Sequence, residues 1–229
     1  MSLRKIAFVE NEFYHIYNRG VDRRSIFSGK DDLKRFFQSM SEFNTIKPIG
    51  SIYEHSFNKD IKDNLPNPPL IQFVAYCLNP NHFHFIITQL EERGIEKFMH
   101  RLGTGYTKYF NEKHSRSGAL FQGRFKANHI NSNEYLLHAS VYVNLNYQVH
   151  KLKSDKNLFL SSWNEYEDEN ETNHGICSKE IILDQFKSIK RYKEFTEKTL
   201  EDILKKRADI VIELENMAKN KHLEVELPS

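Results

Sequence analysis

Two histidines separated by a single residue, His82 and His84, have the spacing most suggestive of chemistry in this chain. Phe83 and Phe85 alternate with them. Successive side chains of a β-strand point to opposite faces, so a strand here would present both imidazoles on one face and both phenyl rings on the other. Two neighbouring imidazoles form a candidate metal site. The alternative is a pair of unrelated histidines on a half-buried strand.

The residues around the histidines indicate a β-hairpin. The segment Asn79-Pro80-Asn81 is typical of a turn. Residues 70–78 before it are rich in Ile, Phe, Val and Tyr, and residues 82–89 after it continue the apolar pattern. Two such runs joined by a short polar turn favour antiparallel strands, with the histidines at the start of the second strand.

The remaining residues up to 150 predict an α+β domain. Strands are expected over 13–19 and 119–127, and helices over 31–45, 91–114 and about 131–145, the last beginning with a pattern similar to a capping box. Residues 49–57 are ambiguous, with part of a strand as one interpretation. The order β-α-β-β-α-β, followed by a further helix, is that of the ferredoxin-like fold. That fold has a four-stranded antiparallel sheet with its first and third strands at the centre, so the histidines are expected on a central strand.

The chain is expected to divide near residue 150. Residues 1–150 carry an excess of five basic residues, whereas residues 151–229 carry an excess of three acids. The second part is expected to be a helical C-terminal extension with two polar helices, over about 178–195 and 199–218. Within 101–130 there are six basic residues and a single acid, which fits a polyanionic partner, although a solvated basic face is the simpler alternative.

Three polar residues, His138, Tyr142 and Asn146, recur at intervals of four along the helix that follows the fourth strand. Such spacing forms one stripe on a helix. If this helix packs across the histidines, Asn146 is a candidate third ligand, and a His/His/amide set suits Mg²⁺ or Mn²⁺. Tyr142 would stand one turn away as a candidate nucleophile for a phosphodiester. A free phenol has a pKa of about 10 and would need activation, and a role in the core or at its rim is the alternative.

Composition argues against several other classes of protein. Two isolated cysteines, Cys77 and Cys177, do not form a disulfide framework or a zinc finger, so a reduced cytoplasmic protein is expected. The N-terminal residues lack the apolar core of a signal peptide, and no apolar run approaches the length needed to span a membrane.

Four sequence blocks together resemble one family. These blocks are Tyr14 to Gly20, Tyr76 to His84, Tyr109 to Lys126 and Tyr142 to Asn146. Taken in order, they are similar to the single-tyrosine HUH transposases, and more narrowly to the insertion-sequence-200-like family and its REP-associated tyrosine transposase branch. Two departures stand out. Asn79 replaces the usual Met before Pro80, and Tyr147 replaces the Pro that usually follows the helical Asn.

The resemblance implies a function and a role for each residue. His82, His84 and Asn146 would bind a divalent metal, Mg or Mn, and Tyr142 would form a 5′-phosphotyrosine with single-stranded DNA. The substrate would carry hairpin-forming palindromic ends in a prokaryotic cytosol, and the protein would act as a monomer or a homodimer. A non-cleaving ferredoxin-like nucleic-acid-binding protein and a replication-initiator-type nickase are the alternatives.

The expected DNA contacts come from the basic loops and strand ends. Arginine and lysine there would neutralise phosphates. The candidates are Asn18, Arg19, Arg23, Arg24, Arg116, Arg124 and Lys126. His138 is a candidate site-lining residue. Tyr106 and Tyr109 would stack on bases or, as their helical spacing favours, pack in the core.

Overall fold

The computed structural model describes residues 7–57, 67–152, 158–168 and 175–223, with side chains described up to residue 210. The strands are β1 (Phe13–Arg19), β2 (Ile71–Asn79), β3 (His82–Gln89), β4 (Lys126–Ile130) and β5 (Leu160–Ser161). The helices are α1 (Lys30–Glu42), α2 (Ile52–Phe57), α3 (Gly94–Lys113), α4 (Asn133–Asn144), α5 (Asn146–Val149), α6 (Trp163–Glu167), α7 (Glu180–Leu183) and α8 (Ile189–Leu223), with a short 3₁₀ turn, η1, at Val21–Arg23.

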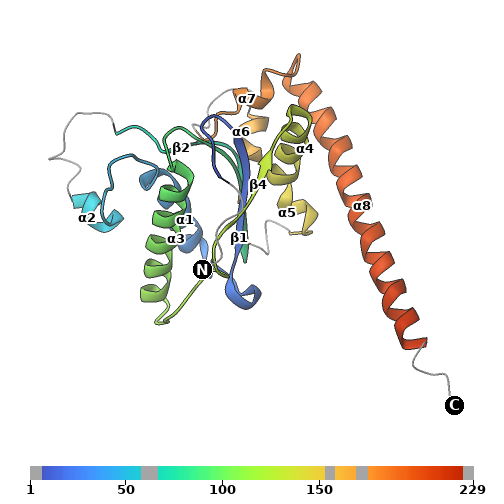
Figure 1. Cartoon of the computed structure of the whole chain (residues 1–229), viewed down its shortest axis with the longest axis horizontal. Coiled ribbons are helices and arrows are strands. Elements are labelled where there is room, and N and C mark those ends of the chain that lie inside the picture. The colour runs from blue at the N-terminus through green and yellow to red at the C-terminus, as the bar shows by residue number, and fades with distance from the viewer. Residues whose placement is uncertain (1–6, 58–66, 153–157, 169–174, 224–229) are drawn as a thin grey trace.

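The strands form one antiparallel sheet in the order β4-β1-β3-β2-β5 (Figure 1). The predicted ferredoxin-like α+β fold is confirmed, with β1 and β3 at the centre. The sheet has one more strand than expected, because the two-residue β5 from the C-terminal part pairs with the outer edge of β2.

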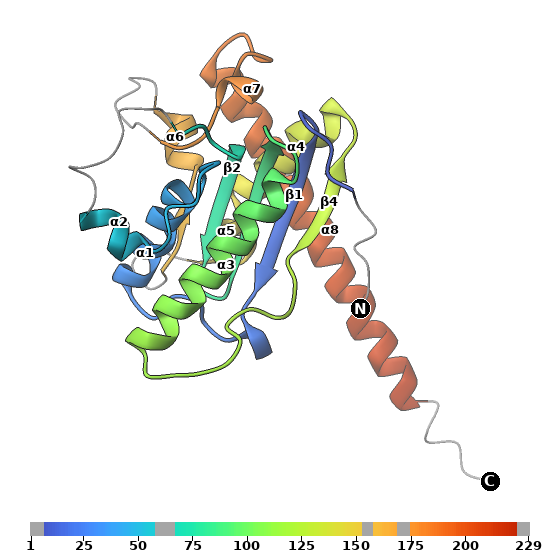
Figure 2. The same ribbon diagram turned by 60° about the vertical axis from the view of Figure 1, so that its left-hand side comes forward.

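One face of the sheet packs against α1 and α3, which lie side by side (Figure 2). Apolar residues at helical spacing on α3 are buried there, including Phe98, Leu102 and Tyr106. The hydroxyl of Tyr106 donates to the carbonyl of Ile26 at 2.6 Å. Tyr106 is fully buried, so it packs in the core and cannot stack on bases.

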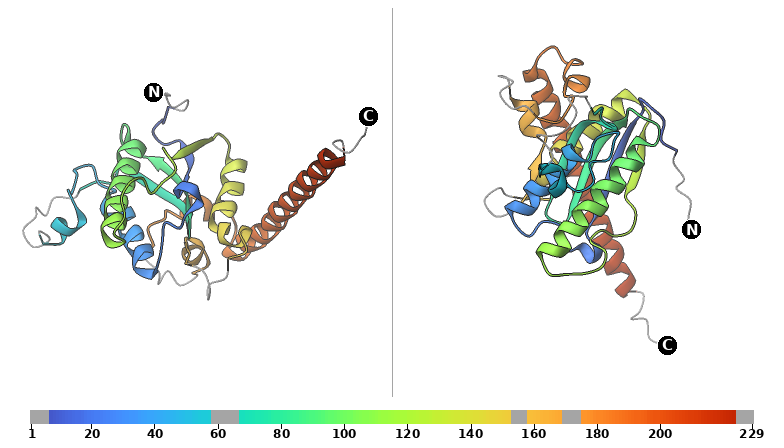
Figure 3. Two further views of the ribbon diagram at one scale, coloured as in Figure 1. Left: turned by 90° about the horizontal axis from the view of Figure 1, so that it is seen from below. Right: turned by 90° about the vertical axis from the view of Figure 1, so that its left-hand side faces the viewer.

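The opposite face packs against α4, and the C-terminal part packs around α4 in turn (Figure 3). Sheet residues such as Ile86 share a buried cluster with Val143 of α4 and with Tyr166, Ile182 and Tyr192 from beyond residue 150. Residues on both sides of the expected boundary therefore share one core. Helix α8 then continues away from the body as a single rod (Figures 1 and 3).

Two predicted elements were wrong, and one segment that the sequence left ambiguous is a helix. The fourth strand runs over 126–130 instead of 119–127, because Gly118 and Gly123 adopt positive φ angles of 83° and 67° and make 119–125 an irregular loop. Residues 52–57 form a helix. The two expected C-terminal helices are largely one, α8, since Thr196 and Thr199 are buried against the body instead of marking a break.

Among the described residues, no helix combines the length and the apolar character needed to cross a bilayer.

Candidate active site

His82 and His84 lie on the same face of β3, at the end of the strand next to the hairpin turn. The strand register places Arg19 opposite His82 and Tyr17 opposite His84 on β1, and Asn79 opposite His82 on β2. Directly paired residues share a face of a sheet. The histidine face thus includes polar or aromatic side chains from three strands at this end.

Helices α4 and α5 cover the histidine face, and the break between them sets the position of Asn146. The side chain of Ser132 caps α4 by accepting from the Tyr135 N–H, one residue after the start expected from sequence. The helix ends at Asn144, and Leu145 (φ −108°, ψ 19°) leads into α5. Asn146 is therefore the first residue of a new short helix, not the next position on the stripe of α4.

Asn146 meets His82 and Asn79 in a fully or partly buried polar cluster. The Asn79 side-chain amide donates to Asn146 Oδ1 at 2.8 Å and lies 2.9 Å from His82 Nε2. His82 Nδ1 lies 2.6 Å from the amide oxygen of Asn81, which can only accept, so this nitrogen carries the ring proton. His82 Nε2 is then an acceptor, and it faces Asn146 Oδ1 at 3.2 Å.

His84 is paired with another histidine that the sequence pattern did not single out. His15 Nε2 lies 2.8 Å from His84 Nδ1, and both residues are only 8% exposed. Their rings stack with centroids 5.0 Å apart, and the ring of Tyr17 lies against both, 5.1 Å from His15 and 5.6 Å from His84. A hydrogen bond to one ring nitrogen fixes the tautomer and the orientation of the ring.

Tyr142 projects from α4 onto the same pair of rings. Its ring is edge-on to His84, with centroids 5.6 Å apart, and lies 6.0 Å from His15. It is half-buried, and its hydroxyl makes no hydrogen bond within the described part of the chain. The histidine pair, Asn146 and Tyr142 thus come together from β3, α5 and α4 of a single chain.

His150, just after α5, is a further histidine at this site. Its ring centroid is 4.6 Å from that of His82. Sequence reasoning missed His15, Asn79 and His150, because each comes from a different element. The only local signal was the alternation that puts His15 on the same face of β1 as Tyr17.

Burial keeps these imidazoles neutral. It lowers the pKa of His15 and of His150 to about 4, in the latter with the added effect of His82 and Arg207. Burial likewise holds the pKa of His84 well below its usual value, and lowers that of His82 against the opposing effect of Asn146 Oδ1, which can accept a hydrogen bond from the protonated ring. Near pH 7 the rings therefore keep the lone pair that a metal ligand or a hydrogen-bond acceptor needs.

No three His, Cys, Asp or Glu side chains of the described ranges gather closely enough to hold a metal ion. A metal centre on His82 and His84 would need the amide oxygen of Asn146 as a ligand. The donor set suits such an ion, because His82 Nε2 and Asn146 Oδ1 direct lone pairs at one common point, where the Asn79 side-chain amide lies within hydrogen-bond distance of both. The amide nitrogen of Asn146 is buried and has no partner among these residues.

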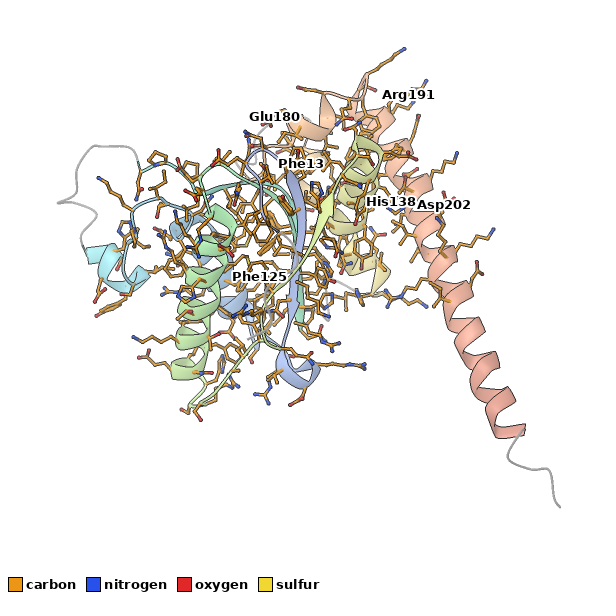
Figure 4. All side chains as sticks on the ribbon, viewed as in Figure 1. Phe13, Phe125, His138, Glu180, Arg191 and Asp202 are labelled. Carbon is orange, nitrogen blue, oxygen red and sulfur yellow. The ribbon has the colours of Figure 1, made fainter. Side chains whose placement is uncertain are left out.

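His138 does not join the other members of the predicted stripe. It is exposed and faces α8, where Lys206 and Asp202 are its charged neighbours (Figure 4). Helix α4 ends before Leu145, and α8 packs on α4. These two features separate His138 from Asn146.

The predicted DNA-contacting residues fall into two groups. Arg19 and Lys126 are exposed on the histidine face, since Lys126 pairs with Tyr17 of β1. Arg23 and Arg24 are exposed in and after η1, next to the hairpin turn. These four cations lie on elements that border the histidines.

The other three predicted contacts lie elsewhere or serve the fold. Arg116 is half-buried and donates to the Asn111 side chain and to the carbonyl of Ala119. Asn18 ties the 119–125 loop to β1 by donating to the carbonyl of Gly123 at 3.2 Å. Arg124 is exposed and lines a cavity of about 980 Å³ between α3 and this loop, on the face of the sheet opposite the histidines.

Together, fold and site define an α+β protein whose ferredoxin-like sheet presents a histidine pair to a tyrosine-bearing helix. The family model described as "Transposase IS200 like" matches residues 8–146, and the chain belongs to this family of transposases. A search of curated proteins finds no match. Among solved structures, the chain is similar to a REP-associated tyrosine transposase bound to a REP hairpin, with 14% identity and a TM-score of 0.47, over 78% of this chain and 98% of that one.

Proposed function

We propose that this transposase cleaves and rejoins single-stranded, hairpin-containing DNA through a covalent 5′-phosphotyrosine on Tyr142. The observation that carries the proposal is the convergence of Tyr142, Asn146 and the histidine pair within one chain. A nucleic-acid-binding module without chemistry would have no need for a half-buried tyrosine set edge-on against a buried histidine pair.

Tyr142 is the nucleophile in this proposal. Its hydroxyl oxygen attacks the scissile phosphorus and loses its proton, while the bond from phosphorus to the 3′ oxygen of the preceding nucleotide breaks. The 3′ oxygen leaves as a hydroxyl after taking up a proton, and the 5′-phosphate stays on the tyrosine. The phosphotyrosine retains a phosphodiester bond, so the 3′-hydroxyl of another strand can displace the tyrosine without ATP.

His82, His84 and Asn146 would hold a divalent ion, Mg²⁺ or Mn²⁺, beside the reacting phosphate. Such an ion supplies Lewis-acid chemistry by drawing charge from a phosphoryl oxygen. The protein residues around it orient the ligands. Asn81 keeps the proton on His82 Nδ1, and the hydrogen bond with His15 sets the ring of His84.

Arg19, Arg23, Arg24 and Lys126 would bind the DNA backbone at the open end of the histidine face. Each of these cations is exposed, and each adds a salt-dependent contribution to affinity by releasing counterions from the DNA. We assign Arg116 and Asn18 to the fold, on the hydrogen bonds described above.

A labelled single-stranded hairpin incubated with the protein and Mg²⁺ or Mn²⁺ tests the proposal. We expect an adduct that survives denaturation and is absent with Tyr142→Phe. Tyr135→Phe, which removes a partly exposed phenol at the other end of α4, is the matched control and should form the adduct. Adduct formation by Tyr142→Phe at the wild-type level would refute the nucleophile, and tight hairpin binding with no adduct under any condition would favour a non-cleaving binding protein.

A further inference from the structure

Helix α8 brings the C-terminal extension against the short helix that carries Asn146. Ile203 of α8 is buried in a cluster with Val141 and Leu145 around α4 and with Val149 at the end of α5. Beyond this contact α8 leaves the body, as the views from two directions agree (Figures 1 and 3). The point of departure is thus next to the residues that complete the candidate active site.

Arg207 lies one helical turn after Ile203, so it is on the side of α8 that faces α5. Its Nη1 donates to the carbonyl of Val149 at 3.1 Å. His150 follows Val149 directly, and its ring packs against His82. A guanidinium has five N–H donors, and within the described residues this carbonyl is its only hydrogen-bond partner.

Arg207 also brings a positive charge to this edge of the site. Its guanidinium is held at the carbonyl of Val149, one residue before His150, whose ring packs against that of His82. A guanidinium remains charged at every accessible pH. Arg207 is therefore a permanent cation beside a site proposed to hold a phosphodiester.

We propose that Arg207 binds a backbone phosphate of the single-stranded DNA next to the scissile position, which makes the C-terminal extension part of the DNA-binding surface. The inference rests on the proposed function. The planar fork of a guanidinium suits two oxygens of one phosphate, and the bond to Val149 leaves the rest of the fork free to bind them. The competing explanation is that Arg207 only caps the C-terminal carbonyls of α5.

The salt dependence of DNA binding separates these explanations. In a Tyr142→Phe background, which removes the chemistry, we expect Arg207→Gln to reduce the slope of log affinity against log salt by about 0.7, the value for one phosphate contact on a single strand. Arg207→Lys should restore the slope, and Arg207→Glu should reduce it at least as much as Gln. Glutamine can still donate to Val149, so a capping role alone predicts an unchanged slope for Arg207→Gln.

The matched control is Lys205→Gln, which removes the same charge from an exposed position about 200° around α8. It should leave the slope unchanged, and equal slopes for Lys205→Gln and Arg207→Gln would overturn the inference. Thermal melts of each variant show whether α8 stays docked. The adduct assay on otherwise wild-type protein keeps the two claims apart. If the wild-type protein forms the adduct but Arg207→Gln keeps the full salt slope, only the assignment of Arg207 fails. If the wild-type protein neither binds the DNA nor forms an adduct, the proposed function is rejected.

Discussion

The protonation state of single nitrogen atoms decides what the candidate site can bind. Asn81 Oδ1 accepts a hydrogen bond from the protonated Nδ1 of His82. Nε2 therefore keeps its lone pair, which is directed toward the Asn146 side chain. His84 needs the same arrangement, because Nδ1 is engaged with His15 and only its other nitrogen can act as a ligand. Residues that hydrogen-bond to the second ring nitrogen of a metal-binding histidine commonly change metal affinity by about 10- to 100-fold.

His15→Ala should therefore weaken Mn²⁺ binding roughly 10-fold, because His84 loses the partner that holds its ring. His15→Gln should restore most of the affinity, since its amide oxygen can accept from His84 Nδ1. The free-ion signal of Mn²⁺ in electron paramagnetic resonance titrations measures this without any DNA. His129→Ala, at a partly exposed histidine on β4, is the control, and equal affinities for His15→Ala and wild type would remove His15 from the site.

The sequence was sufficient to predict the residues that lie on periodic elements. The shared face of His82 and His84 follows from strand alternation, whereas Tyr142 was singled out by the resemblance of its segment to the transposase family. His15, Asn79 and His150 were missed, because their proximity to His82 and His84 depends on strand pairing and on the start of a new helix at Asn146. Local sequence patterns predict neither feature. His138 was expected to line the site, but its side chain is exposed and has Lys206 and Asp202 of α8 as charged neighbours.

A buried carboxylate in the first turn of α1, Asp32, links this helix to the C-terminal end of the neighbouring α3. Burial alone would raise the pKa of Asp32, but the ammonium of Lys113, the N–H of Ser28 and the ring of His114 outweigh it and lower the pKa below its usual 3.8. Lys113 Nζ lies 2.8 Å from one carboxylate oxygen and His114 Nε2 lies 2.9 Å from the other. The charged carboxylate thus holds the two helices that form one layer of the fold.

A depressed pKa in the folded state means that Asp32 stabilises the protein above its unfolded pKa and loses this contribution as the pH falls through the lower, folded value. Asp32→Asn should reduce the free energy of unfolding by about 2 kcal/mol at pH 7, and the difference from wild type should shrink below about pH 4. Urea unfolding at pH 7 and pH 3.5 measures it. A deficit that stays constant across this range would contradict a charged Asp32.

Two glycines in the middle of α3 give opposite predictions. A Cβ on Gly105 would lie 2.6 Å from the ring of Phe43, so Gly105→Ala should cost about 1–2 kcal/mol. A Cβ on Gly103 meets nothing within 4 Å, so Gly103→Ala should stabilise the helix by roughly 0.5–1 kcal/mol. Chemical denaturation measures the free energy of unfolding of both variants. If the two substitutions changed it in the same direction, the described packing of α3 would be wrong.

Most elements of the fold could be predicted because their hydrophobic period is strong. Helix α3 buries the residues that its three- and four-residue spacing indicated, and β2 and β3 flank the expected turn. The fourth strand was displaced, because the apolar residues of 119–125 fill the core as a loop while 126–130 pair with β1. Tertiary packing also overrode local signals in α8, where buried threonines continue a helix expected to break.

At the scale of the whole molecule, the histidine pair, the tyrosine and the extension form one body. Tyr142 contacts His84 of its own chain, and Ile203 and Arg207 of α8 contact the helices that carry Tyr142 and Asn146. The extension therefore belongs to the same folded unit as the proposed active site. A centre completed within one chain has no need of a tyrosine from a second copy.

Mixing two inactive variants tests this directly. Tyr142→Phe lacks the nucleophile and His84→Ala lacks a proposed ligand, and neither chain alone holds a complete centre. We expect their mixture to form no more adduct with hairpin DNA than the separate variants do. As a control, each variant mixed with wild-type protein should give the amount of adduct that the wild-type protein forms alone. Recovery of adduct in the mixture would show that the tyrosine serves the histidines of a partner.

The most direct test of the central claim is to identify the residue to which DNA becomes attached. After reaction of the full chain with single-stranded hairpin DNA and Mn²⁺, nuclease and protease digestion followed by mass spectrometry locates the phosphorylated peptide. The account predicts a nucleotide 5′-phosphate on the hydroxyl of Tyr142, lost when the metal is chelated beforehand. Attachment to any other tyrosine, or to a serine, would contradict it.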